Sequence, residues 1–375
     1  MSFSVTPRRP VEASATTEGE VFGRTQSITD MLGQYYYPAV ALGYGAMGTM
    51  STNSYRGWSE TAIGYRASAS IEYGFGNTSV GALALSANRN GNNNTVVGFG
   101  AGTRAAMNES VVVGKGSAAV GSIAAFDGST YFWENVIVGQ HNFSAYHVTN
   151  WVKRTVAIGN YIAAYGDTNR TPVSYENTIF IGTEVAYSNY GNLLDCIGIG
   201  TRVFSEVGND ADMDDVIAIG RRAGGSFGSG QGQNAIFIGA TAGQYAANKS
   251  NVVYLGNSSI THIYAQVTSI TSLSDVRDKT NVEDLDHGLS FVNSLRPVKF
   301  EWNMRDEGKV GVKDMGFIAQ EVIEAEDAID DHETLMLSDR SDDERLAVSA
   351  GRLIPVLVKA IQELSTRLDQ IEASV

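Results

Sequence analysis

The chain has 375 residues and a net charge of −14 at pH 7, with 41 acidic and 27 basic side chains. This length leaves room for two or three units, because a single hydrophobic core stops growing well below it. The acidic balance disfavours a nucleic-acid groove. The one cysteine, Cys196, excludes an intrachain disulfide framework and a zinc cluster of thiolates.

Charge and glycine both divide the chain near Ser274. Residues 274–375 hold 23 acidic and 12 basic residues, whereas residues 1–273 hold 18 and 15. Glycine is distributed the other way, with 36 of 41 before Ser274. Such an abrupt change indicates a boundary between two kinds of structure. We therefore expect three segments: an N-terminal segment (1–37), a body (38–273) and a C-terminal domain (274–375).

The N-terminal segment is polar and poor in apolar side chains. Its first ten residues carry arginines and prolines, and no apolar stretch follows them. We expect neither a signal peptide nor a membrane span. This composition is typical of a segment that is disordered until it docks, which predicts attachment to a larger assembly.

The body repeats a short apolar run that ends in glycine. The runs end at Gly43, Gly64, Gly81, Gly98, Gly114, Gly139, Gly159, Gly182, Gly200, Gly220, Gly239 and Gly256. Each unit reads as one β-branched strand of four or five residues, closed by a glycine turn. One such strand cannot bury its apolar face alone. About twelve stacked units therefore predict a mostly β, elongated solenoid rather than a β-sandwich.

Units such as residues 62–69 and 112–119 resemble the head repeats of trimeric bacterial adhesins and the fibre repeats of many phages. In those families three chains each supply a parallel β-roll around a shared threefold axis. The resemblance covers about residues 38–260. It implies that the body is an elongated trimeric parallel β-roll.

Inserts between the strands are rich in aromatic and amide side chains. They include Tyr35 to Tyr37, Tyr131 to Trp133, Tyr146 and His147, Asn150 and Trp151, and Tyr187 to Tyr190. Insertions in a solenoid form surface loops, and exposed aromatics on loops bind sugars or protein partners. Packing between the protomers of a trimer is the alternative.

The segment after Leu273 contains a serine and a lysine five residues apart, Ser274 and Lys279. A neutral lysine can take the proton from a serine hydroxyl, provided that burial or a neighbouring cation lowers the pKa of the lysine. The two side chains meet if the residues between them turn. By spacing alone this signal is weak, because serines and lysines five apart are common.

The same segment resembles the entry to the intramolecular chaperone domain of phage tailspikes, tail fibres and neck appendages. That family reads Ser-Asp-x-Arg-x-Lys, followed by a leucine-rich segment ending in proline, an aromatic pair and a Gly-Phe-Ile-Ala-Gln-Glu motif. The counterparts here are residues 274–279, Leu289 to Pro297, Phe300 with Trp302, and Gly316 to Val322. Asp278 stands where the family often has an apolar residue.

The resemblance implies that Ser274 attacks the carbonyl group of Leu273 and that Lys279 acts as the base. The domain would be an autocatalytic serine endopeptidase with a single turnover in its own chain, without a cofactor or metal. Cleavage between Leu273 and Ser274 would follow assembly. It would leave residues 1–273 as the mature fibre and release residues 274–375.

The implied protein is a homotrimeric fibre or tailspike of a phage-type virion that binds the host surface. Its C-terminal chaperone, a small α+β domain ending in a long helix, would direct trimer assembly. The implied partners are other copies of the chain, virion tail or head proteins at the N-terminal segment, and a host glycan or protein. No nucleic acid and no membrane insertion is expected. The location would be the virion, after synthesis in the host cytoplasm.

The end of the chain carries apolar residues at alternating spacings of three and four. They are Ile354, Leu357, Ile361, Leu364, Leu368 and Ile371. This heptad pattern predicts a coiled-coil seam. Three heptads are too short to be stable alone, so the helix is expected to act with the rest of its domain.

Two other functions stay open: a tailspike that degrades a host glycan, and a structural head or neck fibre without a receptor. Glycan hydrolysis needs two carboxylates across a cleft. The acids of the body, such as Glu134, Asp167, Glu176 and Glu206, show no such pairing in the sequence.

Metal binding has weak support in the sequence. A calcium loop is suggested only by the composition of Asp210, Asp212, Asp214 and Asp215. These residues lack the glycine and the distal glutamate of such a loop, which favours a solvated turn. The five histidines are scattered without the spacing of metal ligands.

Overall fold

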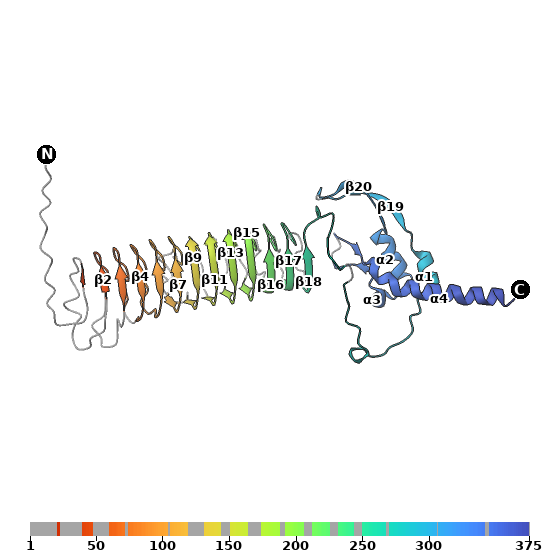
Figure 1. Cartoon of the computed structure of the whole chain (residues 1–375), viewed down its shortest axis with the longest axis horizontal. Helices are drawn as coiled ribbons and strands as arrows, with labels where there is room; N and C mark the ends of the chain where they lie inside the picture. Colours follow the sequence, from red (N-terminus) through yellow and green to blue (C-terminus); the bar gives the residue numbers. More distant parts are fainter. Residues whose placement is uncertain are drawn as a thin grey trace. The chain divides into compact units, whose positions relative to one another are not determined.

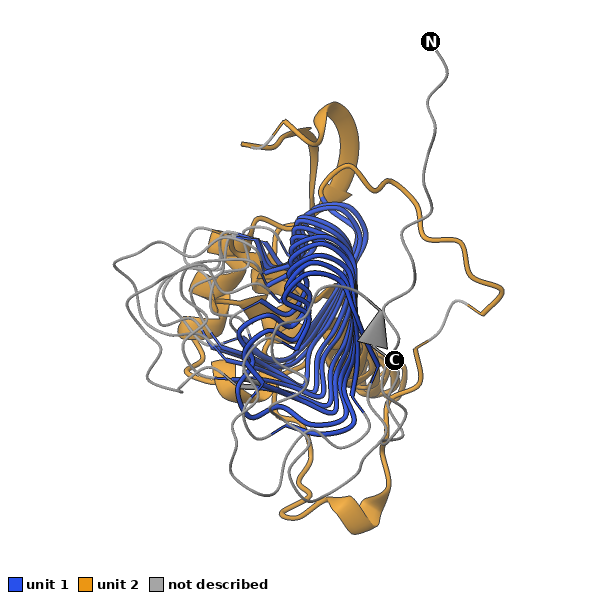
Figure 2. Ribbon diagram, turned by 90° about the vertical axis from the view of Figure 1, so that its left-hand side faces the viewer, with its two compact units in different colours: residues 1–257 blue, residues 258–375 orange. Residues whose placement is uncertain are grey.

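The computed structural model describes residues 21–22, 40–47, 60–71, 74–103, 106–118, 131–143, 151–163, 174–187, 192–205, 212–225, 232–243, 250–267, 270–305, 307–341 and 345–374. The chain divides into two compact units, Met1–Asn257 (unit 1) and Ser258–Val375 (unit 2), which are coloured in Figure 2. The three segments expected from composition stay predictions. Nearly all of the N-terminal segment lies outside the described residues.

Unit 1 is a parallel β-solenoid, as the repeats predict. Its first column of strands comprises β2 (Val40–Leu42), β3 (Thr61–Ile63), β4 (Thr78–Val80), β5 (Thr95–Val97), β7 (Val111–Val113), β9 (Val136–Gln140), β11 (Val156–Asn160), β13 (Ile179–Thr183), β15 (Ile197–Thr201), β16 (Met213–Ile219), β17 (Gly232–Ile238) and β18 (Val252–Leu255). Each strand pairs in parallel with the next one in this column, and β1 (Val21–Phe22) pairs with β2. Figure 1 shows these strands side by side.

The strands of this column have three to seven residues, where four or five were expected. Several turns between them contain residues that the structure does not describe. The expected count of about twelve repeats is therefore not confirmed and stays a prediction.

A second column of parallel strands corrects the expectation for two aromatic inserts. It comprises β6 (Ala106–Asn108), β8 (Tyr131–Trp133), β10 (Trp151–Lys153), β12 (Tyr175–Glu176) and β14 (Leu193–Leu194), and β16 continues it. Tyr131–Trp133 and Trp151 therefore lie in strands and not in loops. Strand alternation buries Phe132 completely and leaves Trp133 and Trp151 exposed. Residues 35–37, 146–147, 150 and 188–190 lie outside the described residues.

The core of unit 1 is filled by the middle residue of the apolar run in the strands of the first column. Ala41, Val96, Ile137, Phe180 and Phe237 are all buried, whereas the residues before and after them point outward. The outward residues form what we call the outer apolar stripe. Its exposed members are Val40, Leu42, Val111, Val113, Val136, Ile158, Ile179, Ile181, Ile219, Ile238, Val253 and Leu255, at 36% to 62% exposure.

The repeated glycines form a column in which successive backbones touch. From Gly43 to Gly239 their φ angles lie between +122° and +143°, a region closed to L side chains. A Cβ added to Gly200 would lie 2.7 Å from the carbonyl oxygen of Gly220. Figure 2 views unit 1 (blue) along the stacking direction, so that the successive turns of the solenoid, which we call coils, lie behind one another. Close approach of the backbones, as well as the turn, therefore requires glycine here.

After the strands of the first column the chain turns a corner of the solenoid. At several of these corners a bulky residue adopts the left-handed backbone conformation. Met47, Leu85, Phe143 and Phe204 have φ between 50° and 54°. This conformation costs an L residue about 1–2 kcal/mol. Hydrogen bonds between coils stabilise it: the amide of Phe143, for example, donates to the carbonyl of Ile162 at 2.8 Å. The corner side chains are also buried in the core.

A ladder of buried polar side chains runs inside unit 1, beside the first column. The side-chain oxygen of Asn77 accepts from the amide of Asn94, and that of Asn94 accepts from the amide of Ser110, both at 3.1 Å. Each asparagine also donates to a backbone carbonyl, Asn77 to Gly91 at 2.7 Å. Glu60 occupies the equivalent position before Asn77 and accepts from it. Its other oxygen, Oε2, is buried without a hydrogen-bond partner.

Unit 2 is a small α+β domain. Its elements are η1 (Val276–Asp278), α1 (Leu289–Ser294), the antiparallel pair β19 (Val298–Asn303) and β20 (Val310–Gly316), α2 (Ala319–Asp327), α3 (His332–Leu335), the pair β21 (Ser338–Asp339) and β22 (Ala347–Val348), η2 (Ala350–Arg352) and α4 (Leu353–Glu372). Phe291, Val322, Leu335 and Val356 lie in its core. No helix within the described ranges has the length and apolar character to cross a membrane.

We predict that Gly200→Ala destabilises the solenoid by at least about 3 kcal/mol, because it adds both a forbidden φ and a backbone clash. Gly100→Ala is the matched control: its φ is +63° and a Cβ there would meet nothing closer than 3.7 Å. It should cost about 1 kcal/mol. The midpoint of thermal unfolding measures both, and equal shifts would contradict the backbone-contact account.

A second prediction concerns Glu60, whose burial raises its pKa from 4.5 to about 7. A protonated Glu60 can donate as the ladder asparagines do. The contribution of protonated Glu60 to the free energy of unfolding is complete below about pH 4.5. It decreases by about 3 kcal/mol in all as the pH rises through about 7. Glu60→Gln stays neutral. The difference in unfolding midpoint between wild type and this variant should therefore change between pH 4.5 and pH 8, and a constant difference would refute the prediction.

Candidate active site

The predicted serine and lysine meet at the surface of unit 2. Lys279 Nζ lies 2.6 Å from Ser274 Oγ and 3.4 Å from the carbonyl oxygen of Ser274. Both residues are exposed, and Leu273 before them is 97% exposed. The chain between Ser274 and Lys279 forms the single 3₁₀ turn η1, so the two side chains meet across a turn, as the spacing requires.

The arrangement places a nucleophile and a potential base in contact, beside the peptide bond that would be cut. The carbonyl of Leu273, which precedes Ser274, accepts a long hydrogen bond of 3.4 Å from Ser272 Oγ. A lysine ammonium can only donate to Ser274 Oγ, and it can act as a base only after losing a proton. The contact therefore has the geometry for proton transfer, and it needs surroundings that neutralise Lys279.

The other motifs of the C-terminal domain are joined by polar contacts. Arg296, which precedes the proline of the leucine-rich segment, forms a bidentate ion pair with Glu321 of α2. Phe300 and Trp302 lie edge to face on β19, with ring centroids 5.1 Å apart. Trp302 Nε1 donates to Asp314 on β20 at 3.0 Å. The ion pair joins α2 to the residue before Pro297, whereas the contacts of Trp302 lie within the β19–β20 pair.

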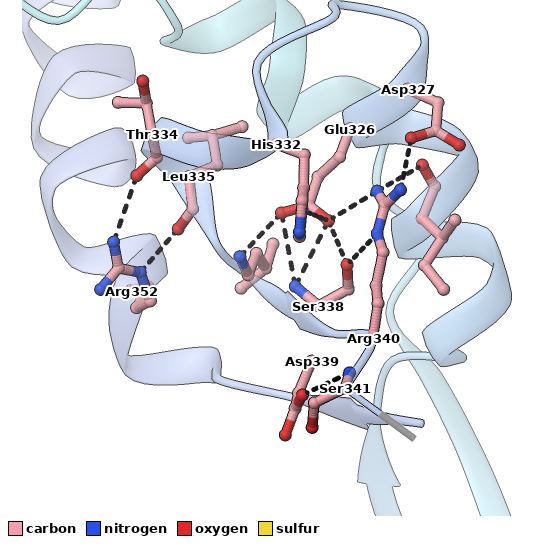
Figure 3. A network of polar contacts seen from close by, with 12 residues as sticks. Glu326, Asp327, His332, Thr334, Leu335, Ser338, Asp339, Arg340, Ser341 and Arg352 are labelled. Atoms are coloured by element: carbon pink, nitrogen blue, oxygen red, sulfur yellow. Dashed lines mark hydrogen bonds and ion pairs between the residues drawn. The ribbon is translucent and has the colours of Figure 1, made fainter. Parts of the chain in front are cut away.

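Unit 2 also contains a buried carboxylate, which the sequence analysis did not identify. Glu326 of α2 is fully buried and accepts from the amide of Leu337 at 2.7 Å and from the Ser338 hydroxyl (Figure 3). Arg340 and His332 also contact it, at 3.3 and 3.2 Å. Burial alone would raise the pKa of Glu326, but these hydrogen bonds lower it overall. The signal available in the sequence was an acid four residues after the apolar Val322, which places both on one face if this segment is helical.

Helix α4 has two apolar faces. Leu353, Val356 and Ala360 are buried against the domain. The heptad residues Ile354, Leu357, Ile361, Leu364, Leu368 and Ile371 are all exposed, at 42% to 65%. The predicted seam is therefore a continuous apolar face that unit 2 leaves open.

The weaker candidates form no site among the described residues. Glu134 is exposed at a corner, and Glu176 pairs with Arg154. Asp212 accepts from the amide of Asn192 at 2.9 Å. Asp214 has a raised pKa, first because of partial burial and then because of Asp215 and Asp195. Asp167, Glu206 and Asp210 lie outside the described residues, within which no group of His, Cys, Asp and Glu could hold a metal.

Residues 274–332 match the family Peptidase_S74, described as the chaperone of endosialidase. The match begins at Ser274 and includes Lys279, and it covers a small part of the chain. Searches of curated proteins and of solved structures found no match. The family match at the C-terminal part and the parallel β-solenoid body together fit a phage fibre or tailspike with a C-terminal chaperone domain.

Proposed function

We propose that the protein is a homotrimeric virion fibre whose C-terminal domain directs assembly and then cuts itself off between Leu273 and Ser274. The observation that carries this proposal is the 2.6 Å contact of Lys279 Nζ with Ser274 Oγ, at the start of a segment that matches an autoprocessing chaperone family. Spacing alone would be weak. The direct contact and the family match support it independently.

In the proposed reaction, Ser274 Oγ attacks the carbonyl carbon of Leu273 and its proton passes to Lys279 Nζ. The Oγ–C bond forms, the C–N bond to Ser274 breaks, and the nitrogen of Ser274 receives a proton. The ester that results links Leu273 to the Ser274 hydroxyl. Water then hydrolyses this ester, which leaves a carboxylate on Leu273 and a free amine and hydroxyl on Ser274.

Exposure of the site supports a cut that waits for assembly. In the single chain both Ser274 and Lys279 are exposed to water. A lysine acts as a base only as the neutral amine, which burial favours. Packing of neighbouring chains around the turn would supply such burial in the proposed trimer, so folding of one chain alone would not start the reaction.

Three apolar surfaces that are exposed among the described residues support the trimer. They are the exposed heptad face of α4, the outer apolar stripe of unit 1, and the β19–β20 pair, on which Val310, Val312 and Met315 are exposed. An isolated two-stranded pair is marginally stable in water. Exposed apolar patches of such extent are typical of protein interfaces. Two further copies of the chain would cover all three.

We further propose that the fibre is part of the virion and binds a glycan or protein on the host surface. Residues 1–37 would attach it to tail or head proteins. On unit 1, Trp133 and Trp151 are 48% and 42% exposed on adjacent paired strands, with Lys153 Nζ 4.2 Å from the Trp151 ring. Exposed aromatic residues of this kind are common in binding surfaces.

We expect purified wild-type protein to consist of two species, residues 1–273 and a fragment that begins at Ser274. Ser274→Ala and Lys279→Ala should leave a single full-length chain, because each removes one partner of the proton transfer. Ser290→Ala and Lys299→Ala, which alter exposed residues away from the turn, should cleave normally. Gel electrophoresis and N-terminal sequencing read the result. Intact wild-type chains in folded trimers would rule out self-cleavage.

A chain that ends at Leu273 should aggregate or remain monomeric when it is made without the C-terminal domain. The reason is that the repeats alone do not align three chains. Ser274→Ala full-length protein is the control, since it keeps the domain and should form trimers. Size-exclusion chromatography with light scattering compares the two. Soluble trimers from the short chain would show that the body aligns itself and that the domain has another role.

A further inference from the structure

Two charged residues between the proposed serine and lysine form a closed contact. Arg277 Nε donates to both carboxylate oxygens of Asp275, at 3.0 and 3.1 Å, and Arg277 Nη2 donates to Oδ2 at 2.6 Å. A guanidinium that donates to a carboxylate through two of its nitrogens fixes the relative orientation of the two groups as well as their distance. Neither residue touches the peptide bond between Leu273 and Ser274 in a described contact, so both are candidates for an indirect role.

The same carboxylate begins the 3₁₀ turn. Asp275 is the N-cap of η1, and its Oδ1 accepts from the backbone amide of Arg277 at 2.9 Å. The turn then closes through two backbone hydrogen bonds of 3.2 Å, from Asp278 to Asp275 and from Lys279 to Val276. This closure returns the chain at Lys279 towards Ser274. The side chain of Lys279 then reaches Ser274 Oγ at 2.6 Å.

Local polar contacts are the main support of this turn. None of the residues of η1 is buried, so no apolar packing holds it. A three-residue 3₁₀ helix is weak by itself, because its hydrogen bonds are few and poorly aligned. An N-cap carboxylate stabilises such a turn by satisfying an amide that has no partner within the helix. The Arg277 side chain holds that carboxylate in place.

We propose that Asp275 and Arg277 are positioning residues for self-cleavage: together they fold the turn that holds the Lys279 amine against the Ser274 hydroxyl. This inference rests on the proposed function. Their loss leaves the nucleophile and the base in the chain but makes their contact rare. Misplacement by about 1 Å can slow an enzymatic step by on the order of 100-fold, so the rate of cleavage is sensitive to this turn.

The test measures the rate of cleavage in full-length chains after synthesis in a cell-free system. Asp275→Ala removes both the cap and the ion pair, and we expect a loss on the order of 100-fold. Asp275→Asn keeps a side-chain oxygen that can cap the turn. Arg277→Lys keeps the positive charge but cannot donate through two nitrogens. Each should lose about tenfold, between the wild type and Asp275→Ala. Asp278→Asn, which alters the other acid of the turn, is the matched control and should cleave at the wild-type rate.

Two further readouts separate positioning from folding and from direct proton transfer. Trimer content, measured by light scattering, should equal that of Ser274→Ala for every variant. The pH at which the cleavage rate reaches half its maximum should be unchanged in Asp275→Asn, because the proton still passes to Lys279. Loss of trimer in Asp275→Ala would assign the pair to folding, and a shifted pH profile would assign Asp275 to proton transfer. Either result overturns the inference.

Failure of the inference is distinguishable from failure of the proposed function. If the wild type cleaves and Asp275→Ala cleaves at the same rate, the positioning role is wrong while self-cleavage stands. If trimeric wild type never cleaves, self-cleavage itself is wrong and the inference falls with it. A graded loss from wild type through Asp275→Asn to Asp275→Ala, with trimers intact, supports the positioning role.

Discussion

The close approach of backbones at the glycine column is the constraint on which unit 1 depends. At Gly200, as at the other glycines of the column, the neighbouring coil occupies the space that a side chain would take. Glycine must therefore lie beside glycine, as Gly139, Gly159 and Gly182 do in the strand pairing. Because side chains alternate along a strand, this pairing of glycine with glycine also determines which residues of each strand point inward. The core and the outer apolar stripe both follow from it.

The fold was predictable where local preference and global structure agree. Short β-branched strands and recurrent glycines favour a parallel solenoid, and the structure has one. The corners were not predictable, because Leu85 and Phe143 adopt a conformation that each disfavours alone and that only the neighbouring coil stabilises. The second column was also missed. Its strands have two or three residues, several of them aromatic, and they resemble inserts until their pairing with adjacent coils is known.

The candidate site shows the same division. Ser274 and Lys279 were identified through the motif around them, since a spacing of five residues carries little information. What the sequence did not reveal is the role of the residues between them, because hydrogen bonds from one side chain to its neighbours follow from a particular turn. Glu326 was missed for a different reason. A buried acid is costly without partners, and its donors Leu337 and Ser338 come from a segment beyond its own helix.

Alignment within one chain and alignment between chains differ in physical terms. Inside the solenoid, large and small residues fit together: Phe180 pairs with Gly198, where a Cβ would lie 2.9 Å from the Phe204 ring. A slip by one coil would break this packing.

The outer apolar stripe has no such markers, because it consists of valine, isoleucine and leucine throughout. In the proposed trimer, sliding one chain past another by a coil would place like residues against like. The information for alignment between chains must then come from outside the repeats. In the proposed assembly, the C-terminal domain would supply that information at one end, because its helices form local contacts faster than long β pairings do. Slow unfolding would then keep the three chains aligned after the template is removed.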